Sequence, residues 1–134
     1  TYPDRRGEPD FEAGCPGHRL MMLLDDVEVD PQAHWLSDLA ARASLGMRTS
    51  SHEALLSAAK DGGGLACLAR FRADPEPGLR RLATPIPPPA TEIWLAVHKD
   101  SRGTPRTRIA LSAIADAVKA LAATLDPPDE DGRT

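Results

Sequence analysis

The stretch that decides the fold class is residues 48–71, RTSSHEALLSAAKDGGGLACLARF. In residues 45–49, which overlap its start, Leu45, Met47 and Thr49 alternate with Gly46 and Arg48, and this alternation predicts a half-buried strand. Ser50 and Glu53 have the S-x-x-E spacing of a capping box, so we expect a helix that ends at the three glycines 62–64. Residues 65–71, LACLARF, form an apolar run that predicts a second strand. Strand, helix and strand with short loops predict a βαβ unit with a parallel pair and a right-handed crossover.

The residues upstream of this unit predict a loop, a strand and a helix. Residues 1–17 are polar and rich in proline and glycine, which indicates a lead-in loop with at most one turn of helix. Residues 20–24 form a short apolar run that suits a buried strand. Asp30 and Pro31 are typical of a helix start, because aspartate caps free amides and proline is tolerated at the first helical position. We expect this helix to end near residues 44–46.

The residues downstream predict two further strands and one long helix. Residues 74–78 predict a turn, residues 79–82 a short exposed strand, and the PIPPP segment 85–89 a stiff connector. Residues 93–98, IWLAVH, are the clearest candidate for a buried strand. Thr104 and Pro105 then begin a long helix. Its apolar stripe has a period of 3.6 residues and consists of Ile109, Ala113, Ile114, Ala117, Val118, Leu121, Ala122 and Leu125.

Composition excludes several classes of function. The 134 residues suit one ordinary domain, and 16 basic minus 20 acidic residues give a net charge of −4, which disfavours nucleic-acid binding by this chain alone. No apolar stretch approaches the roughly 18 residues of a membrane helix, so neither a membrane span nor a secretory signal is expected. Two cysteines far apart indicate reduced cytoplasmic thiols. Because the first residue is Thr1, we expect a fragment of a larger protein.

The strongest candidate for chemistry is residues 49–52, TSSH, where a strand leads into a helix N-terminus. Free amides and the helix dipole favour an anion there, and ligands of open α/β sheets bind at the carboxyl ends of strands. A small carboxylate is one candidate ligand, and neutral ligands remain open. The alternative is that Ser50 only caps its own helix.

For the other candidate residues we favour structural roles. The glycines 62–64 follow a helix and precede a strand, the reverse of a phosphate-binding loop. His98 is compatible with a base or a ligand contact, but we favour a structural role, and for Cys67 we favour a core role. The four histidines lack metal-ligand spacing, so no metal and no cofactor is expected. No nucleophile, base and orienting group can be identified together, and the chain is not expected to be an enzyme.

Two segments carry a family resemblance. Residues 48–71, together with residues 93–108, IWLAVHKDSRGTPRTR, resemble the C-terminal half of the effector-binding domain of LysR-type transcriptional regulators. The lead-in 5–23, RRGEPDFEAGCPGHRLMML, is similar to the link between the two lobes of that domain. The resemblance extends to about residue 125, and residues 94–108 are its most specific part.

The resemblance implies an α/β, type 2 periplasmic-binding-protein-like fold. Residues 1–89 would be the second lobe with its lead-in loop, residues 90–126 the returning strand and C-terminal helix of the first lobe, and residues 127–134 a disordered acidic tail. The winged helix-turn-helix would precede Thr1, so DNA would be contacted only through that missing domain. The full-length regulator would be a cytoplasmic homodimer or tetramer that senses a small-molecule effector without catalysis.

The resemblance also implies the residues of the cleft. They lie at the helix N-terminus, after the glycine-led strand and on the returning strand: Thr49, Ser50, Ser51, Leu68, Ala69, Val97 and His98. The chain departs from the family pattern at Ala69, where a proline is common. Two alternatives remain: a truncated interaction module or solute-binding lobe that modulates a full-length regulator without binding DNA, and a small α/β enzyme that uses Cys67 or His98.

Overall fold

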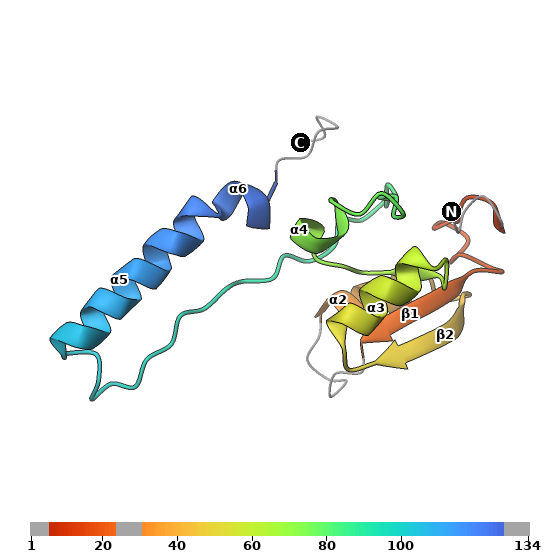
Figure 1. The fold of residues 1–134 in the computed structure, drawn as a ribbon. Helices are drawn as coiled ribbons and strands as arrows, with labels where there is room; N and C mark the ends of the chain where they lie inside the picture. Colours follow the sequence, from red (N-terminus) through yellow and green to blue (C-terminus); the bar gives the residue numbers. More distant parts are fainter. Residues whose placement is uncertain (1–5, 24–30, 128–134) are drawn as a thin grey trace. The chain divides into compact units, whose positions relative to one another are not determined.

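The computed structural model describes residues 6–23 and 31–127, so the predicted cap at Asp30 and almost all of the predicted tail lie outside the described residues. The chain divides into two compact units, Thr1–Ala90 and Thr91–Thr134 (Figure 1). Each unit is described by itself. No helix in these two described ranges has the length and apolar character needed to cross a membrane.

The first unit is built on a small parallel sheet. Its strands are β1 (Arg19–Leu23), β2 (Ser44–Thr49) and β3 (Leu65–Ala66), in the order β2-β1-β3. Both edge strands run parallel to β1, as predicted for the βαβ unit, but β1 lies between the two strands that were expected to form a pair. The register between β1 and β2 shifts after the pair of Leu20 with Leu45, so that Met21 pairs with Met47 and Gly46 forms a bulge.

Two helices pack on the sheet through separate apolar clusters. Helix α2 (Pro31–Leu39) contributes Leu36 to a cluster with Leu20, and α3 (His52–Lys60) contributes Leu55 to a cluster with Met21. Successive residues of a strand point to opposite faces, so α2 and α3 cover opposite faces of the sheet (Figure 1). Helix α2 ends at Leu39, earlier than the predicted end near residues 44–46, because β2 already begins at Ser44.

Helix α3 begins one residue later than the predicted capping box places it. The N-cap is Ser51, whose Oγ accepts a hydrogen bond from the amide N–H of Ala54 at 3.2 Å. The amide N–H of Ser51 donates to Oγ1 of Thr49 at 3.1 Å, and this short turn carries the chain past Ser50 before the helix starts. Capping by Ser50 is therefore wrong. The predicted end at the glycines is confirmed, since Gly62 has a φ of 78° directly after the C-cap.

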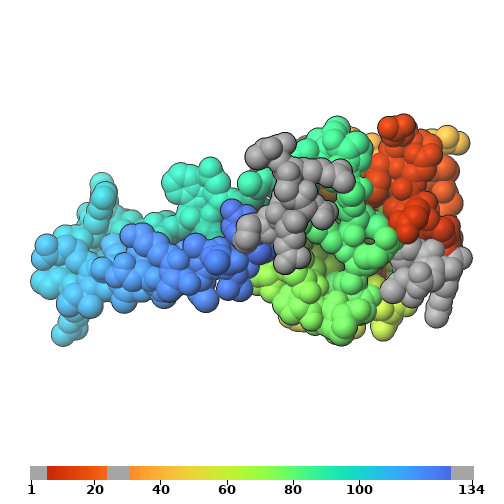
Figure 2. Space-filling model, turned by 90° about the horizontal axis from the view of Figure 1, so that it is seen from above, coloured from red at the N-terminus to blue at the C-terminus, as the bar shows by residue number. Residues whose placement is uncertain are grey.

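The strand predicted over residues 65–71 is mostly wrong. Strand β3 ends at Ala66, because only Leu65 and Ala66 find partners on β1, and helix α4 (Arg70–Ala73) soon follows. The strand predicted over residues 79–82 is also wrong, since that segment has no ladder in the structure. It is held instead by an ion pair of Arg80 with Glu8 at 2.6 Å. Figure 2 shows the lead-in beside this part of the chain.

The second unit is helical. Helix α5 (Pro105–Ala120) begins at Thr104, whose Oγ1 accepts from the amide N–H of Thr107 at 3.3 Å, so the predicted cap is confirmed, and α6 (Ala122–Leu125) follows it. The buried strand predicted over residues 93–98 is wrong: no strand is assigned there, and Trp94 is 82% exposed. A strand needs a neighbouring edge for its hydrogen bonds, and the described part of this unit contains no other strand.

Candidate functional site

The junction between β2 and α3 presents three hydroxyl groups at the carboxyl end of a strand. Thr49 ends β2 and is half-buried, whereas Ser50 and Ser51 are exposed. Oγ1 of Thr49 and Oγ of Ser51 each accept a hydrogen bond from a backbone amide, so both hydroxyl groups can still donate their own proton. The hydroxyl of Ser50 has no protein partner among the described residues. The junction can therefore offer three donors to a ligand.

Two backbone amides add to these donors. Of the first amides of α3, that of Ala54 is bound to Ser51 Oγ and that of Leu55 to the Ser51 carbonyl at 3.0 Å. The amides of His52 and Glu53 have no acceptor within residues 6–23 and 31–127. Amides at this position carry the positive end of the helix dipole, so the arrangement favours an anionic group.

An acidic side chain in the first turn of α3 is neutralised by a neighbour. The carboxylate of Glu53 would compete with an anionic ligand for the helix dipole, but it forms an ion pair with the guanidinium of Arg72. The two side chains are 74% and 31% exposed, so the pair adds little to stability. Its effect is to reduce the negative charge beside the free amides.

Leu68 and Ala69 lie at the same edge of the sheet, just after β3. Leu68 is half-buried against the cluster of Met21 and Leu55, and Ala69 is exposed at the start of α4, where its carbonyl accepts from Ala73 at 3.0 Å. Because β1 separates β2 from β3, two strand spacings, roughly 10 Å, lie between this segment and the hydroxyl groups. The first unit thus brings five of the seven predicted residues to one edge.

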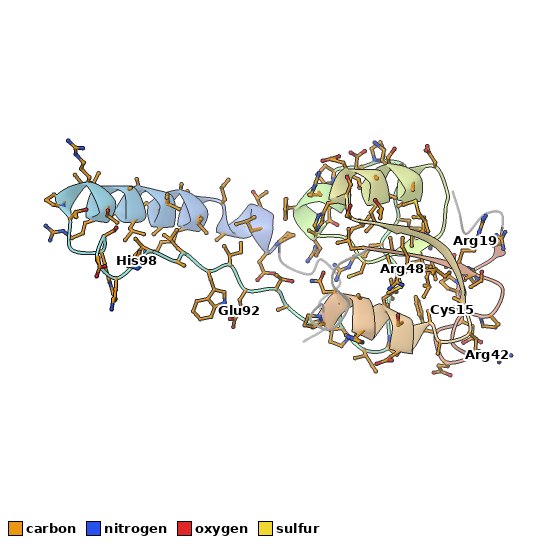
Figure 3. All side chains as sticks on the ribbon, turned by 90° about the horizontal axis from the view of Figure 1, so that it is seen from below. Cys15, Arg19, Arg42, Arg48, Glu92 and His98 are labelled. Carbon is orange, nitrogen blue, oxygen red and sulfur yellow. The ribbon has the colours of Figure 1, made fainter. Side chains whose placement is uncertain are left out.

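The other two predicted residues, Val97 and His98, belong to the second unit. Val97 is half-buried, and His98 is exposed rather than the end of a buried strand (Figure 3). Nδ1 of His98 accepts from the amide N–H of Asp100 at 3.4 Å and lies 3.5 Å from the Asp100 carboxylate. The imidazole is therefore oriented by the loop that precedes α5.

One polar residue near this edge, Gln32, was not predicted from the sequence. A small cavity of about 20 Å³ lies between the strands and both helices, with Gln32, Leu55 and Cys67 in its wall. The thiol of Cys67 donates to Oε1 of Gln32 at 3.8 Å, and Nε2 of Gln32 donates to the carbonyl of Pro89 at 3.4 Å. The cavity has room for about one water molecule, so it is not itself a ligand site. Nothing in the sequence beyond the polar character of Gln32 and its place next to Pro31, in the first turn of the predicted helix, could have indicated these contacts.

The described residues contain no group of three His, Cys, Asp or Glu side chains that could hold a metal ion. Cys67, expected in the core, is half-buried and packs against the cluster of Leu20 and Leu36. Cys15 is fully buried, and burial, followed by the nearby charge of Asp10, raises the pKa of its thiol above 9.0. A raised pKa lowers the thiolate fraction, which makes Cys15 a poor nucleophile at neutral pH.

The family described as LysR substrate binding domain has a sequence model that matches residues 5–119. The chain belongs to this family. No curated protein and no solved structure matches the chain. A LysR substrate binding domain implies a periplasmic-binding-protein-like fold, and the mixed α/β first unit with its small parallel sheet agrees with that fold class. Membership also indicates effector sensing in a LysR-type regulator, a class of protein that typically lacks catalytic activity.

Proposed function

We propose that this chain senses a small-molecule effector for a LysR-type DNA-binding transcriptional regulator. The observation that carries the proposal is the β2–α3 junction of a LysR substrate binding domain: three hydroxyl groups and two free amides meet at the carboxyl end of a parallel strand. Ligands of open α/β sheets bind at such edges, and the effector would lie there.

The effector we propose is a small carboxylate. Its oxygens would accept from the amides of His52 and Glu53 and from the hydroxyl of Ser50, while Thr49 and Ser51 hold the turn in place. Leu68 and Ala69, which follow β3, would form one wall of the effector site. Val97 and His98 would approach from the other lobe.

The larger architecture we propose has two lobes. Residues 1–89 form one lobe with its lead-in, residues 90–126 supply an extended segment and the C-terminal helix of the other, and residues 127–134 are a tail. This division is supported by the exposure of Ile93, Trp94 and Ile109, which are 66%, 82% and 71% exposed and would be covered by the remainder of a lobe. The regulator would be a cytoplasmic homodimer or tetramer that contacts DNA through a separate winged helix-turn-helix domain.

The test is thermal unfolding of the chain, followed by circular dichroism, with a panel of small carboxylates and their neutral amides. A ligand at 100 times its Kd adds about 2.7 kcal/mol to stability, which corresponds to a rise in Tm of roughly 10 °C or more for a unit of this size. We expect a carboxylate, and not its amide, to raise the Tm. Ser50→Ala should reduce the shift, whereas Ser57→Ala, which changes an exposed serine farther along α3, should preserve it.

The second candidate function is an interaction module that modulates a full-length regulator without binding DNA. The exposed apolar residues of the second unit favour it, because such surfaces mark protein contacts. This candidate would be supported if no ligand of the panel raised the Tm and the chain formed a stable complex with a full-length LysR-type regulator. The same result would contradict effector sensing.

A further inference from the structure

A second cavity, of about 540 Å³, lies in the first unit away from the carboxyl ends of the strands. Its walls come from three segments, residues 11–14, 35–42 and 85–86. The first two segments precede β1 and β2, so they lie toward the amino ends of these strands. A volume of this size is typical of small-molecule sites, which measure roughly 300–1,000 Å³.

Hydrogen bonds hold the three segments together. The amide N–H of Arg42 donates to the carbonyl of Gly14 at 2.9 Å and ties the end of the α2 segment to the lead-in. The indole N–H of Trp35 donates to the carbonyl of Ile86 at 3.2 Å and ties α2 to the proline-rich connector. Because these bonds use backbone groups and the indole edge, the cavity is formed before any ligand arrives, and the indole N–H itself is not needed for binding.

The wall combines aromatic and aliphatic surface with an excess of negative charge. Phe11, Trp35 and Leu39 supply the apolar part. Glu12 and Asp38 supply two carboxylates against one guanidinium, and no protein group pairs with any of these three charged side chains in the described part of the chain. The guanidinium belongs to Arg42, which lies at the outer edge of the first unit (Figure 3).

We propose that this cavity binds a small organic cation with an aromatic or aliphatic body. The aromatic rings attract a cation through their negative faces and cover its apolar body, while Asp38 and Glu12 supply the opposite charge. A carboxylate ligand would meet two like charges at the same place. The site is therefore opposite in charge preference to the β2–α3 junction, and it does not depend on the effector proposed for that junction.

The test uses Trp35 as the reporter. The chain has two tryptophans, so the exposed Trp94 is first replaced in a Trp94→Phe background. Phenethylamine and 3-phenylpropionate, which carry the same ring and opposite charges, are then titrated while Trp35 fluorescence is recorded. We expect a saturable change with phenethylamine at concentrations up to about 10 mM and binding at least about tenfold weaker for phenylpropionate. The affinity for the amine should fall as the salt concentration rises.

Charge variants locate the site. Asp38→Asn and Glu12→Gln should each weaken phenethylamine binding by about three- to tenfold, whereas Arg42→Gln, a control on the same rim, should leave it unchanged or tighten it. All three positions are exposed, and circular dichroism checks that each variant retains its fold. Tighter binding of phenylpropionate that is lost in Arg42→Gln would overturn the proposal. Linear, non-saturating quenching by both probes would overturn it as well.

Discussion

Alanine at each of the three glycines after α3 tests backbone strain and steric overlap, alone and together. At Gly62 the φ of 78° is left-handed, and an added Cβ would have no neighbour within 4 Å. Gly62→Ala should therefore cost only the left-handed conformation, about 1–2 kcal/mol. At Gly64 the φ is 159°, which residues with a side chain rarely adopt, and an added Cβ would also overlap the carbonyl oxygen of Arg19 and lie 3.0 Å from its carbon. Because this carbonyl group belongs to the backbone of the central strand β1, the overlap can be relieved only if β3 moves away from β1.

We expect Gly64→Ala to cost about 3 kcal/mol or more, since overpacking typically costs about 1–3 kcal/mol and the strained φ adds to it. Gly63→Ala should lie between the other two variants. Its φ is not strained, but its Cβ would overlap the sulfur of the buried Met21 and lie 2.8 Å from the carbonyl oxygen of Ala58, which accepts a hydrogen bond from Gly63.

Urea unfolding followed by circular dichroism measures these costs, and thermal unfolding provides a second measure at roughly 4–8 °C per kcal/mol. Gly7→Ala is the matched control, because Gly7 also has a left-handed φ, 80°, with nothing within 4 Å of an added Cβ, but lies outside the sheet. It should cost no more than Gly62→Ala. If Gly64→Ala were to cost the same as Gly62→Ala, the close approach of β3 to β1 would not limit the packing and the reasoning would be refuted.

Three further predictions concern the cap, the core and a buried thiol. Ser51→Ala should lower the free energy of unfolding by about 0.5–2 kcal/mol and Ser50→Ala by less than about 0.5 kcal/mol; equal losses in urea unfolding would contradict the assigned cap. Leu55→Ala, at a side chain that is 1% exposed, should lower the free energy of unfolding by about 2–5 kcal/mol. Leu45→Ala, at a side chain that is 56% exposed, should change it by almost nothing. Because burial raises the pKa of Cys15, the unfolded chain loses this proton first, so the contribution of this thiol to stability is fully present below its unfolded-state pKa and is lost as the pH rises through the folded-state pKa. Urea unfolding across that pH range should show the fall, and Cys15→Ala should reduce it.

The sequence predicted those elements whose signals are local. Thr104 and Pro105 start α5 because capping and proline geometry depend only on adjacent residues. The glycines end α3 for the same reason. The cap of α3 was misplaced by one residue, since Ser50 and Ser51 have equivalent side chains and only the turn held by Thr49 distinguishes them.

Predictions that depended on distant partners were less successful. The apolar runs 65–71 and 93–98 both have strand character, but a strand forms only where an edge offers hydrogen-bond partners, and of these two runs only Leu65 and Ala66 pair with β1. For the candidate site, the alternation of residues 45–49 correctly predicted that Thr49 lies at the end of a strand. The role of Gln32 did not, because its contacts are with Cys67 and Pro89, which are 35 and 57 residues away.

The two units differ in what stabilises them, and this bears on the proposed sensing. The first unit has its own core around Leu20 and Met21, whereas α5 buries none of its side chains. With 16 residues, α5 is only slightly longer than the roughly 12–15 residues below which an isolated helix is marginal in water, and most helices owe their stability to tertiary packing. Its predicted stripe is exposed, with Ile109 71% and Ile114 46% accessible. The carbonyl of His98 accepts hydrogen bonds from the amides of Ser101 and Arg102, so His98 is tied to the turn that leads into α5. Effector contacts from the second unit would therefore depend on a surface that covers this stripe, while contacts at the β2–α3 junction need only the first unit.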